Sequence, residues 1–253
     1  MRNGACNRSN RSRVLQFGCG LTNPGKVALG LLTKPTARDQ QVHIGASNAS
    51  NPCARCLAED LAGVHRGESA FKMGAIIGTA IHERLETLVR EQHPDWMPEQ
   101  RVVIGELPGY GVVKSTTDLY TAHDRQVTDW KTTTKKKLPF IKDALTTEPS
   151  KWDTHSTNEA RFKTTAYIAQ LHLYGRGIIN AGYGVERIGI GFVCRDAVTE
   201  DDVWGFDTDY SEDYTEKVWG RLEAIWAAVQ DGRALETFPS HDFCWYCANV
   251  REN

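Results

Sequence analysis

The sequence predicts an α/β fold in which helices flank one sheet. The hydrophobic patterning runs in the order long helix, three strands, long helix, further strands, and a last helix. This order does not repeat a βαβ unit, so it argues against a doubly wound parallel sheet. The length of 253 residues fits one sizeable domain with an appendage.

The helices are predicted from apolar residues that recur at spacings of three and four. They are expected over residues 53–64, 71–92, 158–181 and 211–231. In the second of these, Ile77, Ile81 and Leu88 mark one face, and His93-Pro94 ends the helix.

The strands are predicted from apolar runs that are bounded by turn residues. They are expected over residues 101–107, 112–120, 126–132, 185–194 and 202–208. Pro108-Gly109-Tyr110-Gly111 joins the first two strands as a turn. The polar, Lys- and Thr-rich stretch 133–157 is expected to be a loop.

Residues 1–50 differ in character from the remainder. They are rich in Asn, Ser, Arg, Gly and Thr, they show no sustained period, and they carry seven Lys/Arg against one acid. We therefore expect a flexible basic arm over 1–50, with one short helix near 26–32, and a single domain over 51–253.

The composition excludes a membrane-spanning helix and a disulfide scaffold. No apolar run approaches the ~18 residues that would cross a bilayer. Seven cysteines are too few for a disulfide framework in a chain of this length. A soluble, cytoplasmic protein is the expectation.

The net charge of −2 conceals a local basic strip. Residues 131–142 hold five lysines and no acid, whereas residues 196–253 hold fourteen acids and four Lys/Arg. A basic strip within an acidic body is typical of a groove for a polyanion, and a solvated loop is the alternative. The lysines that would bind DNA are Lys135, Lys136, Lys137 and Lys142.

Two acids and a lysine on neighbouring strands suggest a metal site. Asp118 and Asp129 are eleven positions apart across a predicted turn, so their carboxylates could meet on one cation. Carboxylate oxygens suit Mg²⁺ or Mn²⁺. Lys131 shares a face with Asp129 and could position the attacking water, help deprotonate it, or stabilise transition-state charge. The backbone carbonyl of Trp130 is a further candidate ligand.

Gln170 and Tyr174 lie four residues apart on the second long helix, so they share a face. They could hydrogen-bond a phosphate or hold Lys131 and its water. A buried polar pair that serves only the fold is the alternative.

Together these segments resemble the RecB-like branch of the PD-(D/E)XK nucleases. The residues that match are His82, Asp118, Asp129, Lys131, Gln170 and Tyr174. The resemblance covers roughly residues 50–250. It implies a restriction-endonuclease-like core with a mixed central sheet, and Mg²⁺- or Mn²⁺-dependent hydrolysis of DNA with His82 as a metal ligand. Glu86, one turn further, fits an acidic position of that helix or a structural ion pair.

Four of the seven cysteines form two CxxC pairs at opposite ends of the predicted domain. Such pairs bring two thiolates to one metal centre. Cys53, Cys56, Cys244 and Cys247 are therefore expected to join the two ends through a metal. The resemblance favours a [4Fe–4S] cluster, although iron–sulfur members place one cysteine before and three after the core; zinc is the alternative. Of the other three, Cys194 ends an apolar strand and is most simply a core residue.

The sequence therefore predicts a metal-dependent DNA exonuclease of recombination, repair or phage DNA processing. An endonuclease with the same site is one alternative, and a non-catalytic DNA-binding protein built around zinc is another. The expected partner is single-stranded DNA or duplex ends, with a helicase or recombination protein as a further candidate. Nothing in the sequence indicates an oligomeric state.

Overall fold

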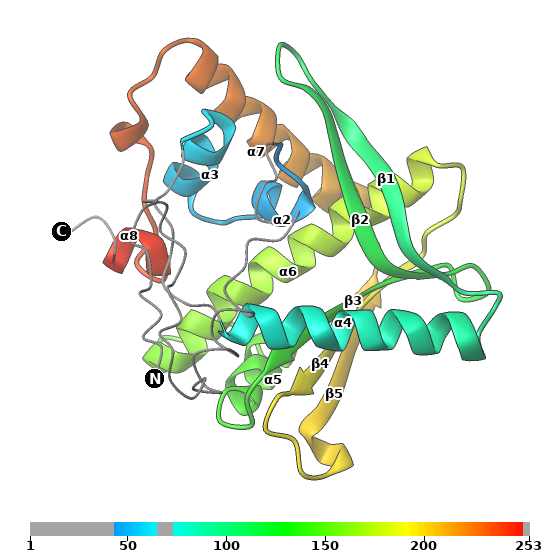
Figure 1. Cartoon of the computed structure of the whole chain (residues 1–253). Helices are drawn as coiled ribbons and strands as arrows, with labels where there is room; N and C mark the ends of the chain where they lie inside the picture. The colour runs from blue at the N-terminus through cyan, green and yellow to red at the C-terminus, as the bar shows by residue number, and fades with distance from the viewer. Residues whose placement is uncertain (1–42, 65–72, 250–253) are drawn as a thin grey trace, which may run out of the picture. The chain divides into compact units, whose positions relative to one another are not determined.

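A computed structural model describes residues 43–64 and 73–249 of the chain (Figure 1). Its helices and strands, in chain order, are α2 (Ala46–Ala49), α3 (Ala54–Leu61), α4 (Met73–Gln92), β1 (Met97–Leu107), β2 (Gly111–Thr121), β3 (Gln126–Thr133), α5 (Leu138–Thr146), α6 (His155–Asn180), β4 (Arg187–Cys194), β5 (Val203–Asp209), α7 (Glu212–Gln230) and α8 (Trp245–Asn249).

The five strands form one mixed sheet in the order β1-β2-β3-β4-β5. The pairs β1–β2, β2–β3 and β4–β5 are antiparallel, and β3–β4 is parallel. A parallel pair needs a long crossover connection, which α5 and α6 provide here. The predicted mixed sheet with flanking helices is confirmed.

The strands β2 and β3 separate at the position of the two acids. They pair at only three positions, of which the last is Leu119 opposite Thr128. The next pair in that register would be Asp118 opposite Asp129, and it does not form. Meanwhile β3 stays paired with β4 as far as Thr133. The sheet therefore opens on one side of β3 where the two carboxylates lie.

The two long helices next to β3 contact different faces of it. Side chains alternate along a strand, so Asp129 and Lys131 lie on one face and Thr132 on the other. The first face meets α6, through hydrogen bonds to Gln170. The second meets α4, where a Cβ added to Gly78 would lie 3.4 Å from the Thr132 hydroxyl.

One predicted loop contains a helix. Residues 133–157 were expected to be irregular, and the structure forms α5 within them. Leu138 and Ile141 are buried, and Leu145 packs against the same core. This i, i+3, i+7 spacing is an amphipathic signal that the surrounding lysines and threonines obscure.

The segment that precedes α3 also packs against the core. Ile44, Ala46 and Ala49 lie within the predicted arm, and all three are buried in the main hydrophobic cluster. The expected helix near 26–32, the rest of the arm and the expected helix start at 71–72 lie outside the described residues.

Within the described ranges, no helix combines the length and the apolar character that crossing a membrane requires.

Candidate active site and cysteine cluster

The structure brings the predicted site residues together from four elements. They are His82 of α4, Asp118 of β2, Asp129 and Lys131 of β3, and Gln170 and Tyr174 of α6. Hydrogen bonds and ion pairs link them into two connected sets, one around each acid, and the acids lie on the diverging strands β2 and β3.

The Asp118 carboxylate connects α4 to β3. Its Oδ2 lies 3.2 Å from His82 Nδ1 and accepts a 2.8 Å hydrogen bond from the Trp130 backbone N–H. This N–H has no β2 partner because the two strands have separated there. The N–H and C=O of a strand residue point the same way, so the Trp130 carbonyl also faces the β2 side.

The Asp129 carboxylate begins a chain of contacts that runs into α6. Lys131 Nζ lies 2.5 Å from Asp129 Oδ2 and donates to Gln170 Oε1 at 3.3 Å. The Gln170 amide donates to Asp129 Oδ1 at 3.4 Å and to the Tyr174 hydroxyl at 2.5 Å. Gln170 therefore holds both members of the Asp129–Lys131 pair, and Tyr174 holds Gln170.

Burial and mutual charge set the protonation of this group. The Asp129 side chain is only 3% exposed, and burial raises its pKa to about 6, with Lys131 opposing the rise and Asp118 adding to it. The pKa of His82 is raised, chiefly by the neighbouring Asp118 carboxylate. Burial acts to lower the pKa of Lys131, but the Asp129 carboxylate outweighs it and the net shift is upward. The lysine therefore stays charged beside the acids.

The donor set fits a divalent cation. His82 Nδ1 and Asp129 Oδ2 are both buried and lack a hydrogen bond of good geometry, although each is within ion-pair distance of a neighbour. Buried polar atoms are normally satisfied, so two such atoms in one acidic site suggest a missing ligand. Carboxylates with one imidazole suit Mn²⁺, and carboxylates with waters suit Mg²⁺.

One residue of this group was not anticipated. The Tyr167 ring centroid lies 5.2 Å from Lys131 Nζ, an arrangement that favours the charged ammonium. Burial raises the pKa of this phenol. Tyr167, Gln170 and Tyr174 recur at i, i+3 and i+7, so the helical spacing itself carried the signal.

Glu86 does not join the acidic group. It accepts two hydrogen bonds from Arg90, at 2.8 and 3.0 Å, as an i, i+4 pair on α4. Of the two alternatives for Glu86, an acidic position of the site or a structural ion pair, the structure shows the ion pair.

The four lysines of the basic strip lie on the turn after β3 and on α5, and no contact to the acidic group is recorded for them among the described residues. Lys135 pairs with Asp202 at 3.2 Å, and Lys137 lies 3.9 Å from Glu159. Lys142 lies over the Trp204 ring at 5.6 Å. Lys136 is exposed.

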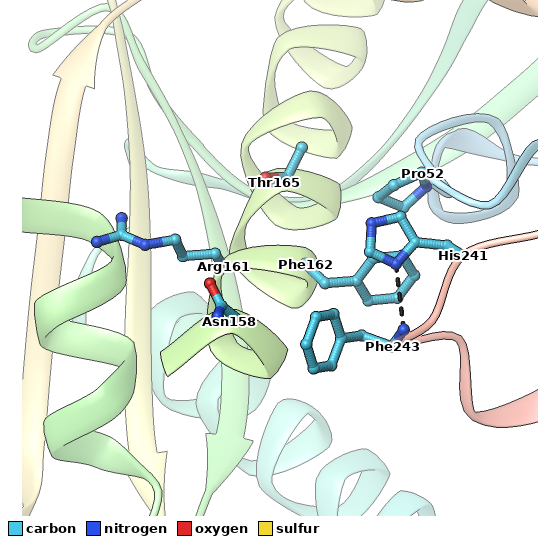
Figure 2. A pocket seen from close by; sticks show the side chains of 7 residues that line it. All are labelled: Pro52, Asn158, Arg161, Phe162, Thr165, His241 and Phe243. Carbon is cyan, nitrogen blue, oxygen red and sulfur yellow. Dashed lines mark hydrogen bonds between the residues drawn. The ribbon is translucent and has the colours of Figure 1, made fainter. Parts of the chain in front are cut away.

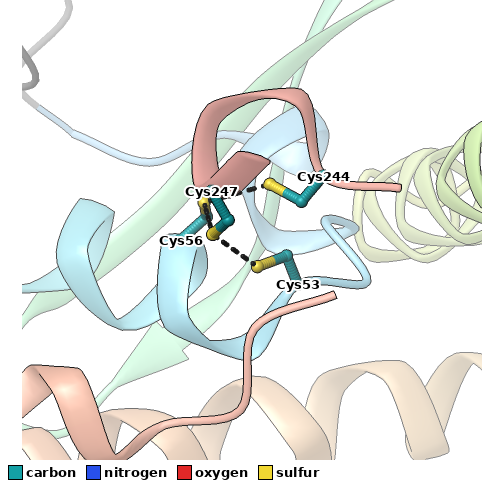
Figure 3. Close-up of side chains that lie close together, drawn as sticks. All are labelled: Cys53, Cys56, Cys244 and Cys247. Carbon is teal, nitrogen blue, oxygen red and sulfur yellow. Dashed lines mark hydrogen bonds between the residues drawn. The ribbon is translucent and has the colours of Figure 1, made fainter. Parts of the chain in front are cut away.

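The two CxxC pairs meet, as expected. Figure 3 shows Cys53 and Cys56 of the α3 segment facing Cys244 and Cys247 of the C-terminal segment. We call these four residues the cysteine cluster. Their sulfur atoms all lie within 4.8 Å of one another, with three contacts of 3.4–3.6 Å. A tetrahedral ion with metal–sulfur bonds of 2.3 Å separates its ligands by about 3.8 Å, which this spacing matches.

The cysteine cluster is largely enclosed. Cys53, Cys56 and Cys244 are buried, and Phe162 and Tyr246 pack against them. A hydrogen bond from Cys56 lowers the pKa of Cys53 to about 4, so one thiolate is already favoured without a metal. Burial raises the pKa of Cys247 to about 12. Thiolates are the form of cysteine that binds metals, so a cluster that already favours one thiolate is suited to a cation.

An arginine holds the loop that precedes Cys53. Arg221 of α7 donates to the carbonyls of Asn51 and Pro52 at 2.8 and 2.9 Å. Cys194 lies elsewhere, buried at the end of β4 in the main core, as its sequence context suggested.

Comparisons with known proteins support the fold. No protein-family model matches the sequence, and no curated protein matches it significantly. Among solved structures, an alkaline exonuclease from Laribacter hongkongensis matches with a TM-score of 0.50 and 12% identity, over 77% of this chain and 90% of that one. A phage-related exonuclease from Haemophilus somnus 129PT matches with a TM-score of 0.47 and 11% identity, over 79% and 90%.

The mixed sheet, its flanking helices and this structural likeness agree with one another. The chain has a PD-(D/E)XK-like nuclease fold, in which a cysteine cluster joins the N- and C-terminal segments.

Proposed function

We propose that this chain is a metal-dependent deoxyribonuclease that hydrolyses phosphodiester bonds, acting as an exonuclease. The observation that carries the proposal is the convergence of Asp118, Asp129 and Lys131 where β2 and β3 separate. The PD-(D/E)XK-like fold supports it, because the structural neighbours are themselves exonucleases.

In this proposal Asp118, Asp129 and His82 hold Mg²⁺ or Mn²⁺, with the Trp130 carbonyl as a further ligand. The bound ion would polarise the scissile phosphate and lower the pKa of an attacking water. Asp118 is held by the Trp130 N–H and Asp129 by Gln170, so the carboxylates are positioned before a cation arrives.

Lys131 supplies the positive charge that the chemistry needs. Its ammonium lies next to the acids and stays protonated, so it stabilises negative charge that develops on the phosphate and orients the attacking water. Gln170 fixes the ammonium, and Tyr174 fixes the Gln170 amide. The two α6 residues thus act through Lys131 and Asp129.

We propose that the cysteine cluster holds a structural metal. A [4Fe–4S] cluster sits inside its four thiolates as a cube and spreads them further than a single ion does. The contacts of 3.4–3.6 Å between sulfur atoms therefore support zinc over the iron–sulfur alternative. An ultraviolet–visible spectrum separates the two, since an iron–sulfur protein is brown and a zinc protein is colourless.

We propose that Lys135, Lys136, Lys137 and Lys142 contribute to binding of DNA phosphates. Lys136 and the exposed parts of Lys135 and Lys137 offer charge to solvent at the end of β3. Lys137 pairs with the surface carboxylate of Glu159, and such an ion pair is weak enough for a phosphate to replace it. Lys135 pairs with the largely buried Asp202 and would have to leave this partner to bind a phosphate.

The test is digestion of end-labelled DNA with added Mg²⁺ or Mn²⁺, on linear and covalently closed circular substrates. An exonuclease degrades the linear form and leaves the circle intact, whereas cleavage of the circle identifies the endonuclease alternative. Asp129→Asn should abolish digestion. Lys114→Met, an exposed change on β2, is the matched control and should leave it unchanged. Full activity in the Asp129 variant would refute the proposed site.

A further inference from the structure

A small pocket opens beside α6, away from the acidic group. Its volume is about 280 Å³, and Figure 2 shows it between α6 and the C-terminal segment. The lining residues are Pro52, Asn158, Arg161, Phe162, Thr165, His241 and Phe243. Pockets for drug-sized ligands span roughly 300–1,000 Å³, so this one suits a single flat ring system.

Aromatic rings form one side of the pocket and hold one another in place. The Phe162 and His241 ring centroids lie 4.3 Å apart, and the Phe243 ring lies 5.9 Å from His241. His241 Nδ1 accepts a 3.2 Å hydrogen bond from the Phe243 backbone N–H. The His155 ring packs on Phe243 from the start of α6, at 5.0 Å. The rings are tilted by 42–57° to one another, so this aromatic platform offers separate ring faces rather than one flat surface.

Polar groups on α6 face the platform. Asn158 and Thr165 offer an amide and a hydroxyl, and within residues 43–64 and 73–249 neither side chain makes a recorded hydrogen bond. Arg161 points away from the rings in Figure 2, because its guanidinium binds Asp153 and carbonyls of the last turn of α5 and of the loop after it. The pocket thus combines a π surface with neutral hydrogen-bonding groups, and no free charge.

The pocket lies on the helix that also carries Gln170. Eight residues separate Phe162 from Gln170, and a helix rises 1.5 Å per residue, so the two lie roughly 12 Å apart along α6. Trp152, which is 81% exposed, precedes His155 by three positions in the sequence. Lys151 lies over the Trp152 ring at 5.0 Å.

We propose that the pocket is a stacking subsite for one nucleobase of single-stranded DNA, a few nucleotides from the bond that is cleaved. The inference rests on the proposed function. A base would stack on the Phe243 ring, beside Phe162 and His241, and direct its polar edge to Asn158 and Thr165. Such stacking is sequence-tolerant, because every base has a π face, so the subsite would hold any strand rather than read its sequence.

The test uses the full chain without added Mg²⁺ or Mn²⁺, so that no strand is cut. A set of oligothymidylates is prepared, each with one 2-aminopurine at a different position and no other fluorophore. The fluorescence of the 2-aminopurine is measured before and after the protein binds. The proposal expects strong quenching at one position of the strand, because stacking on an aromatic ring quenches this base. Equal fluorescence at every position would overturn it.

Three variants locate the stacked base. Phe243→Leu should weaken strand binding about 5- to 150-fold and remove the quenching, the range that corresponds to loss of one stacked base. Phe243→Tyr keeps the ring and should restore both. Val198→Ala, which alters an exposed apolar residue after β4, is the control and should change neither. Wild-type affinity and quenching in Phe243→Leu, with its melting temperature unchanged, would overturn the proposal.

Two further measurements separate the possible results. Thymidine monophosphate should not displace the strand at equal concentration; if it does, the pocket is a free-nucleotide site and the proposal is wrong. Nuclease activity is then assayed with Mg²⁺ on the same oligonucleotide. Position-specific quenching in a protein that cuts no DNA supports the subsite and refutes the proposed hydrolysis. DNA cutting without position-specific quenching supports the hydrolysis and refutes the subsite.

Discussion

Removal of the C-terminal half of the cysteine cluster should strongly destabilise the protein. The double variant Cys244→Ser/Cys247→Ser leaves Cys53 and Cys56 without their partners across the cluster. A metal that bridges the two halves links chain segments that are far apart in the sequence, as a disulfide does. Loss of this link returns conformational freedom to the unfolded chain.

The magnitude follows from the length of chain that the link closes. Cys56 and Cys244 lie 188 positions apart. The loop-closure relation used for disulfides then gives about 5 kcal/mol at 25 °C. Whole domains are stable by about 5–15 kcal/mol, so the link accounts for much of the total. At roughly 2–4 °C per kcal/mol for a body of this size, the melting temperature should fall by about 10–20 °C.

The assay is thermal unfolding followed by circular dichroism, with the bound metal counted by mass spectrometry. The melting temperature of wild-type protein should fall by the same amount after treatment with a strong chelator and should recover when the metal is added back. Ala248→Ser, an exposed change beside the cluster, is the matched control. A metal-free double variant that melts within about 2 °C of the metal-loaded wild type would show that the cysteine cluster does not stabilise the fold.

Three further predictions concern α6. Tyr174→Phe removes the hydroxyl that anchors the Gln170 amide, so kcat should fall about 10-fold in a DNA digestion assay. The melting temperature should stay within a few degrees, because one hydrogen bond is worth about 1 kcal/mol. An unchanged kcat would contradict this prediction. Burial lowers the pKa of His172, so the unfolded chain binds its proton first and stability is lost as pH falls below about 6.5. His172→Phe should reduce the pH dependence of the urea unfolding midpoint between pH 7.5 and 5. The same pH dependence in the variant and the wild type would contradict this prediction. A Cβ at Gly177 would lie 2.5 Å from the Val102 side chain, so Gly177→Ala should cost about 1–3 kcal/mol in urea unfolding. Gly220→Ala on α7 meets open space and should instead stabilise by about 0.5–1 kcal/mol, because Ala favours a helix over Gly.

Much of the fold was predictable because its elements carry strong local patterns. The long helices and all five strands follow from periodicity, and the pair Asp118 and Asp129 follows from its spacing across the turn between two predicted strands. The helix α5 was missed because Lys- and Thr-rich sequence surrounds only three core positions, Leu138, Ile141 and Leu145. Its stability comes from packing on α6 and from Arg161, which are tertiary contacts that a local pattern does not contain.

The arrangement of the candidate site was predictable only in part. The residue types and their spacing indicated Asp118, Asp129 and Lys131, but the early end of β2–β3 pairing is a property of the sheet. Tyr167 was overlooked because an aromatic residue on a core helix is ordinarily a packing residue. The pocket at Phe162 and Phe243 depends on contact between segments some eighty residues apart, which no local pattern reveals.

The proposed role of Lys131 is tested most directly by the rate of DNA digestion by Lys131→Met, measured with Mg²⁺ or Mn²⁺ beside the matched Lys114→Met. Lys131→Met should lose at least about 100-fold in rate, since the charge that stabilises the transition state is gone, and Lys114→Met should digest DNA like the wild type. Digestion by a folded Lys131→Met protein at the wild-type rate would contradict this role.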